Sequence, residues 1–156
     1  SHQTKLSLHF LICGEGAELD KLKRLVKQKA LTNLSFIAAQ NREGVREVMN
    51  VTDAAFISFK PLPVLQTGSP NKYFDALAAG KLIVINFGGW MKKEIEENHY
   101  GISVEGSQDF VRKITPIVNH PDQLKACQFA ARKKAEGTYS RILLADLFSE
   151  LFVVHE

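Results

Sequence analysis

The sequence contains little of what marks several classes of protein. Its 156 residues include two cysteines, Cys13 and Cys127, too few for a disulfide framework or a zinc ribbon. The formal net charge is only +3, so a nucleic-acid partner is not indicated. The charges are interleaved, as in segment 92–97 (KKEIEE), which is typical of a solvated helix face. No apolar run approaches the roughly 18 residues that a membrane-spanning helix needs.

What the sequence does contain is typical of a soluble globular protein, with 45% hydrophobic and 24% charged residues. Its length predicts one domain, at about 100–200 residues per domain. The chain opens Ser1-His2-Gln3 without an initiator methionine, as a cloning remnant before the middle of a longer protein would. We therefore expect residues 1–5 to be a remnant or linker and residues 6–156 to be the folded domain. The low cysteine content indicates a reducing compartment, and we expect a cytoplasmic protein.

Strands and helices are predicted to alternate along the chain. Apolar runs bounded by turn residues predict strands over 6–13, 34–38, 53–59, 82–87 and 102–104. Amphipathic or capped segments predict helices over 17–30, 43–50, 70–79, 90–98, 107–119, 121–136 and 140–154. Pro116 should kink or end its helix, and Pro121 should occupy the first position of the next. The pattern predicts an α/β fold, a Rossmann-like doubly wound parallel sheet with extra C-terminal helices.

Ligands of an open parallel sheet bind beyond the carboxyl ends of the strands, so the loops that follow strands are the candidate sites. The first, Gly14-Glu15-Gly16, would let the backbone approach a phosphate at a helix N-terminus. A dinucleotide fingerprint is not complete, because Leu19 stands where the third glycine belongs. Two interpretations stay open, a tight turn alone and a turn that lines a ligand.

The loop before helix 70–79 carries more information. Ser69 is a good N-cap residue, Pro70 suits the first helical position, and Gly68 leaves the helix N-terminus open. Lys72 lies in the first turn, where a cation is unfavourable beside the positive end of the helix dipole. A bound anion would remove this conflict; the alternative is a capped helix with one surface lysine.

The same helix has two distinct faces by its spacing. Asn71 and Asp75 are four residues apart and share a face. Phe74, Leu77 and Ala78 are expected to form the opposite, apolar face. Gly80 is expected to end the helix.

Several segments of the chain, taken in order, resemble one enzyme family. They are Gly14-Glu15-Gly16-Ala17, Leu31-Thr32-Asn33-Leu34-Ser35-Phe36, Asp53-Ala54-Ala55-Phe56, the run from Ser69-Pro70-Asn71-Lys72-Tyr73-Phe74-Asp75 to Lys81, Gly88-Gly89 with the later Gly101, His120-Pro121-Asp122 and Ala130-Ala131-Arg132. This set, over roughly residues 6–152, resembles the C-terminal, donor-binding half of GT-B glycosyltransferases. It is most similar to the retaining glycosyltransferase family 4, in the subgroup that makes bacterial surface polysaccharides.

The resemblance implies a nucleoside diphosphate sugar as ligand, with UDP as the expected nucleotide. Asp75 matches the second of two acidic positions, which holds the ribose hydroxyls, whereas Thr67 stands where the family has the glutamate that lies against the donor sugar. Loop 38–41 would approach the base. The implied nucleotide-sugar-binding residues are Gly14, Gly16, Ala39, Gln40, Thr67, Gly68, Ser69, Asn71, Lys72 and Asp75. No catalytic residue and no metal or other cofactor is implied for this half.

The resemblance also implies partners. The acceptor would be bound by an N-terminal domain that is missing here, together with the upstream Arg and Lys that hold the diphosphate, and any membrane contact would be made through that domain. This chain alone is expected to be inactive. Two alternatives remain: half of a nucleotide-sugar 2-epimerase of the same plan, and a non-catalytic α/β binding module of flavodoxin or receiver type.

Overall fold

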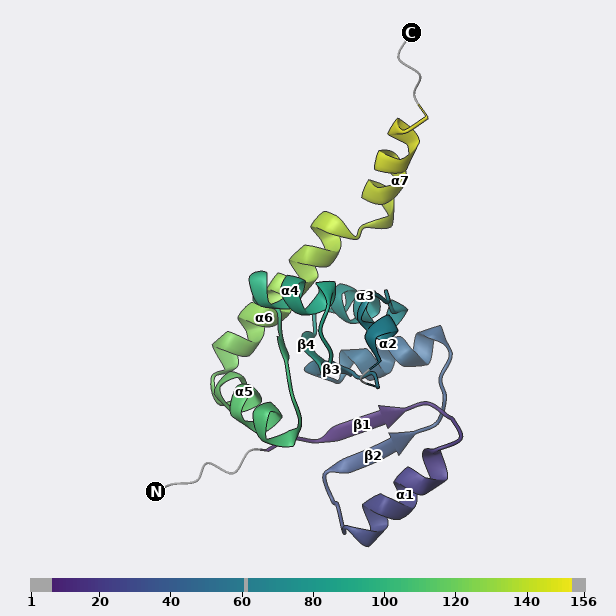
Figure 1. Ribbon diagram of the computed structural model, residues 1–156, viewed down its shortest axis with the longest axis vertical. Coiled ribbons are helices and arrows are strands. Elements are labelled where there is room, and N and C mark those ends of the chain that lie inside the picture. Colours follow the sequence, from purple (N-terminus) through teal and green to yellow (C-terminus); the bar gives the residue numbers. More distant parts are fainter. Residues whose placement is uncertain (1–6, 61, 153–156) are drawn as a thin grey trace. The chain divides into compact units, whose positions relative to one another are not determined.

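A computed structural model describes residues 7–60 and 62–152 (Figure 1). The chain forms two compact units, Ser1–Val48 and Met49–Glu156, each described by itself below. Residues 6 and 153–154, which belong to the first predicted strand and the last predicted helix, lie outside the described residues.

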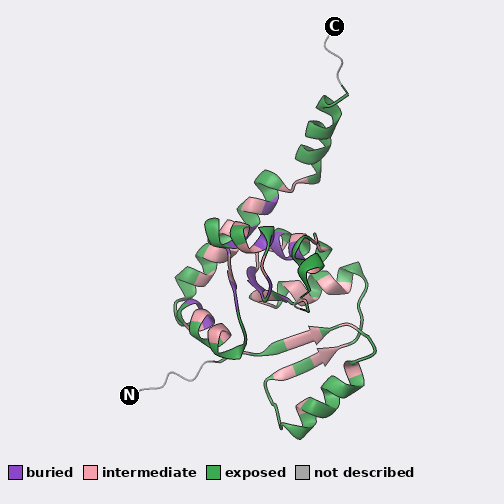
Figure 2. Ribbon diagram, in the orientation of Figure 1, coloured by how far each residue is buried: buried purple, intermediate pink, exposed green. Residues whose placement is uncertain are grey.

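The first unit is a parallel strand pair with its connecting helix. β1 (Phe10–Cys13) leads into α1 (Leu19–Gln28), and β2 (Leu34–Ile37) then pairs in parallel with β1, from Phe10 opposite Leu34 to Cys13 opposite Ile37. α2 (Arg42–Asn50) follows, and the Asn41 side chain caps it by accepting a bond of 2.9 Å from the Gly44 N–H. None of the described residues 7–48 is fully buried (Figure 2).

The second unit contains a three-stranded parallel sheet in the order β3-β4-β5. Its elements are β3 (Ala54–Ile57), a 3₁₀ turn (Pro63–Gln66), α3 (Asn71–Ala78), β4 (Leu82–Ile85), α4 (Trp90–Glu97) and β5 (Gly101–Ser103). All four residues of β4 are buried, because β4 is the central strand and helices pack against it. The buried residues of the described chain begin at Ile57, so the core belongs to this unit (Figure 2).

Three helices complete the second unit: α5 (Ser107–Asn119), α6 (Pro121–Thr138) and α7 (Arg141–Glu150). Pro121 occupies the start of α6, as predicted. Pro116 does not end α5, which continues to Asn119. The missing proline N–H removes one hydrogen bond close to the C-terminus, and the buried Ile114 and Ile117 on either side hold the last turn against the core.

The fold class predicted from the sequence is confirmed: parallel strands alternate with helices, and extra helices follow. Most elements are shorter than predicted; the strand expected over 6–13, for example, begins at Phe10. The ladder hydrogen bonds join the strands as one pair and one triplet, where the sequence suggested a single sheet.

A partly buried cluster around one carboxylate joins elements of the second unit. Glu94 on α4 accepts hydrogen bonds from Tyr73 (2.5 Å) and Tyr100 (2.9 Å) at Oε2, and from Tyr139 (2.6 Å) and Lys134 (3.0 Å) at Oε1. Tyr73 and Tyr100 also share a hydrogen bond of 2.6 Å. We call these five residues the Glu94 cluster. The sequence pattern suggested a solvated helix face here, and that interpretation is wrong for Glu94, whose side chain is 16% exposed.

The protonation of the cluster follows from its geometry. Burial alone would raise the pKa of Glu94, but the hydrogen bonds from the three hydroxyls and from Lys134 outweigh it and hold the pKa below its ordinary value. Burial, reinforced by the neighbouring carboxylate, raises the pKa values of Tyr73, Tyr100 and Tyr139. The cluster therefore holds one carboxylate anion and neutral phenols over the neutral pH range.

Replacing Glu94 should destabilise the fold. In Glu94→Gln the NH₂ group of the amide faces hydroxyl and ammonium donors and cannot accept hydrogen bonds from them, and Lys134 loses its ionic partner. We therefore expect the unfolding free energy, measured by urea denaturation, to fall by about 2–4 kcal/mol. Glu97→Gln on the same helix is the matched control, because Glu97 is 62% exposed and should contribute less than about 1 kcal/mol.

The same substitution should change the pH dependence of stability. A depressed folded-state pKa gives stability that is complete above the unfolded value of about 4.3 and is lost as the pH falls through the folded value. The wild type should lose this contribution in acid, and Glu94→Gln should lack it. Parallel pH profiles for the two proteins would contradict the role assigned to Glu94.

Candidate functional site

The candidate site lies at the carboxyl ends of β3 and β4, where ligands of parallel sheets bind. Residues 62–70, the β3–α3 loop, lead into α3, and Asn86 follows β4. The Asn86 side chain accepts from the Phe59 N–H (2.9 Å) and donates to the Phe59 carbonyl (3.0 Å). This double hydrogen bond holds the chain after β3 against the end of β4.

The N-terminus of α3 lacks a side-chain cap. The helix begins at Asn71, and Pro70 is its N-cap residue in an extended conformation (φ −76°, ψ 133°). The prediction of Ser69 as N-cap and Pro70 as first helical residue is therefore wrong by one position. Because the Ser69 hydroxyl lies one residue too early and Pro70 carries no donor or acceptor side chain, the positive end of the helix dipole is open to solvent or to an anion.

Lys72 lies in the first turn of α3 with its side chain exposed. Its ammonium is 5.2 Å from the centroid of the Phe59 ring, a cation–π contact. No acidic side chain of the described residues forms an ion pair with Lys72. The conflict between this cation and the helix dipole is thus present in the structure, with only an aromatic ring to offset it.

Asn71 and Asp75 share the exposed side of α3, as predicted. The buried side consists of Tyr73, Ala76 and Leu77. Ala78 was expected on the apolar face and is instead exposed. The buried face of α3 is centred closer to Tyr73, because Tyr73 belongs to the Glu94 cluster. The structure thereby brings Asn71, Lys72 and Asp75 together on one exposed helix surface.

The remaining predicted residues of this unit lie in the β3–α3 loop just before the helix. The Thr67 hydroxyl donates to the Val64 carbonyl (3.0 Å) at the end of the 3₁₀ turn. The Gly68 carbonyl accepts a bond of 3.1 Å from the Trp90 indole, and Ser69 is exposed. Thr67 is therefore occupied by a bond within the loop.

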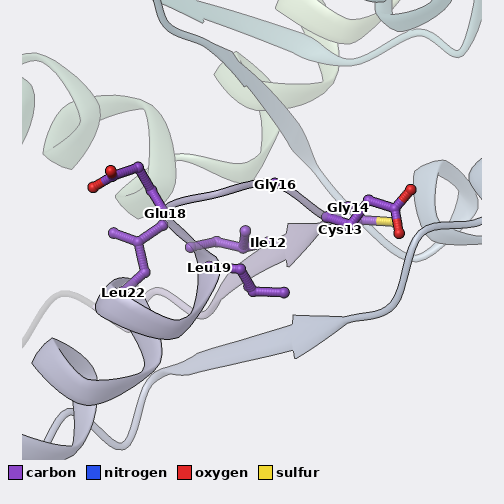
Figure 3. A pocket seen from close by; sticks show the side chains of 8 residues that line it. Ile12, Cys13, Gly14, Gly16, Glu18, Leu19 and Leu22 are labelled. Carbon is purple, nitrogen blue, oxygen red and sulfur yellow. The ribbon is translucent and has the colours of Figure 1, made fainter.

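In the first unit, Gly14 and Gly16 border a hollow of about 190 Å³ in front of α1 (Figure 3). Their φ values of +143° and +157° favour glycine, and a Cβ at either position would meet no atom within 4 Å. Glu15 and Glu18 also line the hollow, and Glu18 pairs with Lys21 at 2.8 Å. The tight turn alone and the turn that lines a ligand both stay open. The carboxylate of Glu15 makes this hollow less favourable for a phosphate.

Ala39 and Gln40 lie in the loop between β2 and α2, and both are exposed. The Gln40 amide donates to the Ala38 carbonyl at 3.0 Å, and Gly44 leaves room for this side chain, since a Cβ there would lie 2.5 Å from Gln40 Oε1. The backbone of this loop is the part that remains available to a ligand.

Sequence reasoning missed Phe59, Asn86 and Trp90 as residues of this region. Their only signal was position: Phe59 and Asn86 lie just beyond the ends of β3 and β4, and Trp90 is the first residue of α4. Among residues 7–60 and 62–152, no three His, Cys, Asp or Glu side chains are grouped so that they could hold a metal ion. In the same part of the chain, every helix is too short or too polar to cross a membrane.

Comparison with known proteins identifies the family. The family model for glycosyl transferases group 1 matches residues 1–134. The chain belongs to the glycosyl transferases group 1 family. The glycosyltransferase resemblance found in the sequence is thereby confirmed at this level. A search of curated proteins found no match.

The fold of this glycosyltransferase chain is also found among solved structures. The crystal structure of WaaG, a glycosyltransferase involved in lipopolysaccharide biosynthesis, matches with a TM-score of 0.66 and 16% identity over 94% of this chain. This likeness supports the Rossmann-like fold class. The match covers 38% of the WaaG chain, so the present chain spans well under half of that protein's length.

Lys72 should act in this glycosyltransferase chain through its charge. Lys72→Ala removes about 0.3–1 kcal/mol of unfavourable dipole interaction and a cation–π contact of similar size, so stability should change little. In this variant the affinity for inorganic pyrophosphate, measured by calorimetry, should be about fivefold lower than in the wild type at low salt. Added salt should reduce this difference in affinity between the two proteins. Lys72→Arg should retain most of the affinity, and Lys133→Ala on α6 is the control. Unchanged pyrophosphate affinity in Lys72→Ala would make Lys72 an ordinary surface lysine.

Proposed function

We propose that this chain is the donor-binding domain of a retaining glycosyltransferase. The enzyme moves a sugar from a nucleoside diphosphate sugar, with UDP as the nucleotide, to a glycan or lipid-linked acceptor. Residues 6–156 form the donor-binding domain, and another part of the enzyme binds the acceptor. The observation that carries the proposal is the uncapped N-terminus of α3 with Lys72 and Asp75 exposed on the same helix, in a chain of the glycosyl transferases group 1 family.

The diphosphate binds at the N-terminus of α3. The N–H groups at the start of the helix, which no side chain caps, and the Lys72 ammonium both favour an anion there. The leaving group of glycosyl transfer is a nucleoside diphosphate, whose negative charge grows as the glycosidic bond breaks. Fixed dipoles and a cation at that position stabilise the developing charge, and in this proposal they do so without a metal ion.

The ribose binds beside Asp75. Asp75 lies four residues beyond Asn71, and four residues of helix span about 6 Å. A nucleotide whose phosphates lie at the N-terminus would place its ribose along the next turn. An ionised carboxylate only accepts hydrogen bonds, so Asp75 can receive both ribose hydroxyl protons.

The donor sugar and the base bind at the flanking loops. Thr67, Gly68 and Ser69 lie in the loop before α3 and face the sugar. The Thr67 hydroxyl donates to the Val64 carbonyl, so it can only accept a hydrogen bond from the sugar. The base binds at the backbone of Ala39 and Gln40. Gly14 and Gly16 bound a hollow that suits hydroxyl groups better than phosphate, because the carboxylates of Glu15 and Glu18 line it.

The proposed ribose contact predicts a selective loss of binding. Asp75→Ala should weaken UDP binding about tenfold or more, because charge-assisted hydrogen bonds contribute about 1.5–3 kcal/mol. Asp75→Asn should lose less, since the amide keeps one acceptor. Pyrophosphate has no ribose and should bind all three proteins alike in calorimetric titrations. Asp146→Ala, an exposed aspartate on α7, is the matched control.

Two results would contradict the assignment of Asp75. An equal loss of UDP and pyrophosphate affinity in Asp75→Ala would place the carboxylate at the phosphates, and unfolding of that variant would make Asp75 structural. UDP binding that is unchanged in Asp75→Ala would remove the ribose contact from the proposal.

The chain by itself should bind donor but not transfer sugar. We expect it to bind UDP with a Kd of about 1 mM or weaker, which corresponds to about 4 kcal/mol. Incubation with UDP-sugars and glycan acceptors should yield no glycosylated product by mass spectrometry. Transfer by this chain alone would show that the active site is not divided between two domains.

A further inference from the structure

Residues 86–90, which we call the β4–α4 corner, lie against the β3–α3 loop. Three separate contacts join the two segments or their immediate neighbours: Asn86 bonds to Phe59 twice, Gly89 approaches Gln66, and Trp90 donates to Gly68. Nothing in the proposed donor contacts uses the side chains of this corner. It nevertheless decides where the loop before α3 lies.

The contact at Gly89 is close enough to require glycine. A Cβ at this position would lie 2.1 Å from the Gln66 carbonyl oxygen and 3.0 Å from its carbonyl carbon. Those atoms are backbone and cannot rotate away as a side chain end could. The φ of +87° at Gly89 also disfavours any other residue. Glycine here lets the loop backbone lie directly on the corner.

Trp90 holds the next peptide of the loop. Its indole N–H donates to the Gly68 carbonyl at 3.1 Å, and its ring meets Tyr73 edge-on with centroids 5.6 Å apart. The Gly68 carbonyl and the Ser69 N–H belong to one planar peptide and point in opposite directions. By holding the carbonyl, Trp90 therefore also sets the direction of the Ser69 N–H, two residues before α3 begins.

α4 thus reaches the α3 region at two points. Trp90 contacts the loop, and one turn later Glu94 accepts the Tyr73 hydroxyl at 2.5 Å. Tyr73 follows Lys72 directly. The loop before α3 and the first turn of α3 are therefore both held by the same helix.

We propose that Trp90 is a positioning residue for nucleotide binding. It holds the Gly68–Ser69 peptide in the orientation that the diphosphate or the donor sugar requires, with Gly89 providing the close approach that makes the bond possible. This inference rests on the proposed function, since it names the element that orders the same site.

The first test removes only the indole donor. Trp90→Phe keeps an aromatic ring against Tyr73 and loses the N–H, so UDP affinity measured by ³¹P NMR titration should fall about threefold to tenfold, the range for one lost hydrogen bond. Ile117→Val, a buried change on α5, controls for a general loss of stability. Equal UDP affinity in wild type and Trp90→Phe would overturn the positioning role and leave the proposed function standing.

The second test displaces the loop and has a close internal control. Gly89 and Gly106 are the N-cap residues of α4 and α5, with φ values of +87° and +89°. A Cβ at Gly106 would meet no atom within 4 Å. Gly89→Ala and Gly106→Ala therefore carry the same backbone strain, and only the first collides with Gln66. UDP should bind Gly89→Ala more weakly than Gly106→Ala; equal affinities would contradict the inference.

The third test is spectroscopic, because the chain contains a single tryptophan. Replacing it biosynthetically with 5-fluorotryptophan gives one ¹⁹F resonance, which should shift saturably with UDP and with pyrophosphate. UDP binding seen by ³¹P NMR with no movement of the fluorine signal would overturn the role of Trp90 alone. A wild-type chain that binds UDP by neither measurement would overturn the proposed function and the inference with it.

Discussion

The second unit depends on one partly buried carboxylate. Glu94 receives three hydroxyl groups and an ammonium from α3, from the residue before β5, from α6 and from the residue after it. Burial of a charge is costly unless every lone pair finds a donor, and here four donors satisfy the two oxygens. Because these donors come from separate elements, the cluster ties α3, α4 and α6 together at one point. Apolar side chains, among them Leu77, Ile83 and Ile85, form the core next to this cluster.

That constraint decides which side of α3 faces solvent. At about 100° per residue, the positions two before and two after a given residue face away from it. Burying Tyr73 in the cluster therefore turns Asn71 and Asp75 outward. Lys72 lies beside the cluster residue and projects toward Phe59. The polar surface that we assign to the nucleotide is exposed because Tyr73 is buried in the cluster. α4 contacts Tyr73 through Glu94 and the loop before α3 through Trp90.

The Gly14–Gly16 turn and the N-terminus of α3 differ in electrostatics. The Gly14–Gly16 turn is lined by carboxylates, whereas the N-terminus of α3 has a lysine and no acidic residue in its first turn. Two anions at close range repel each other strongly in a partly desolvated site. A phosphate group is therefore better placed at α3 than at α1, although both loops follow parallel strands.

The sequence by itself determined the order and type of the elements. β4 was located from its apolar run and α1 from the helical spacing of its leucines, both of which are local patterns. Gly80 was correctly placed just after the end of α3, where it adopts φ +60°. The family and the exposed pair Asn71 and Asp75 also followed from motifs and helical spacing. Only the tertiary structure decided the rest. Glu94 lies in a segment that looks solvated in the sequence, and Trp90 lies two residues before it. Neither role was visible there, because hydrogen-bond partners 21 to 45 residues away leave no periodic pattern. The α3 cap lies one residue later than predicted, and the loop ahead of it contacts Trp90 and Gly89. That contact joins residues more than 20 positions apart and exists only once β4 has brought the two segments together.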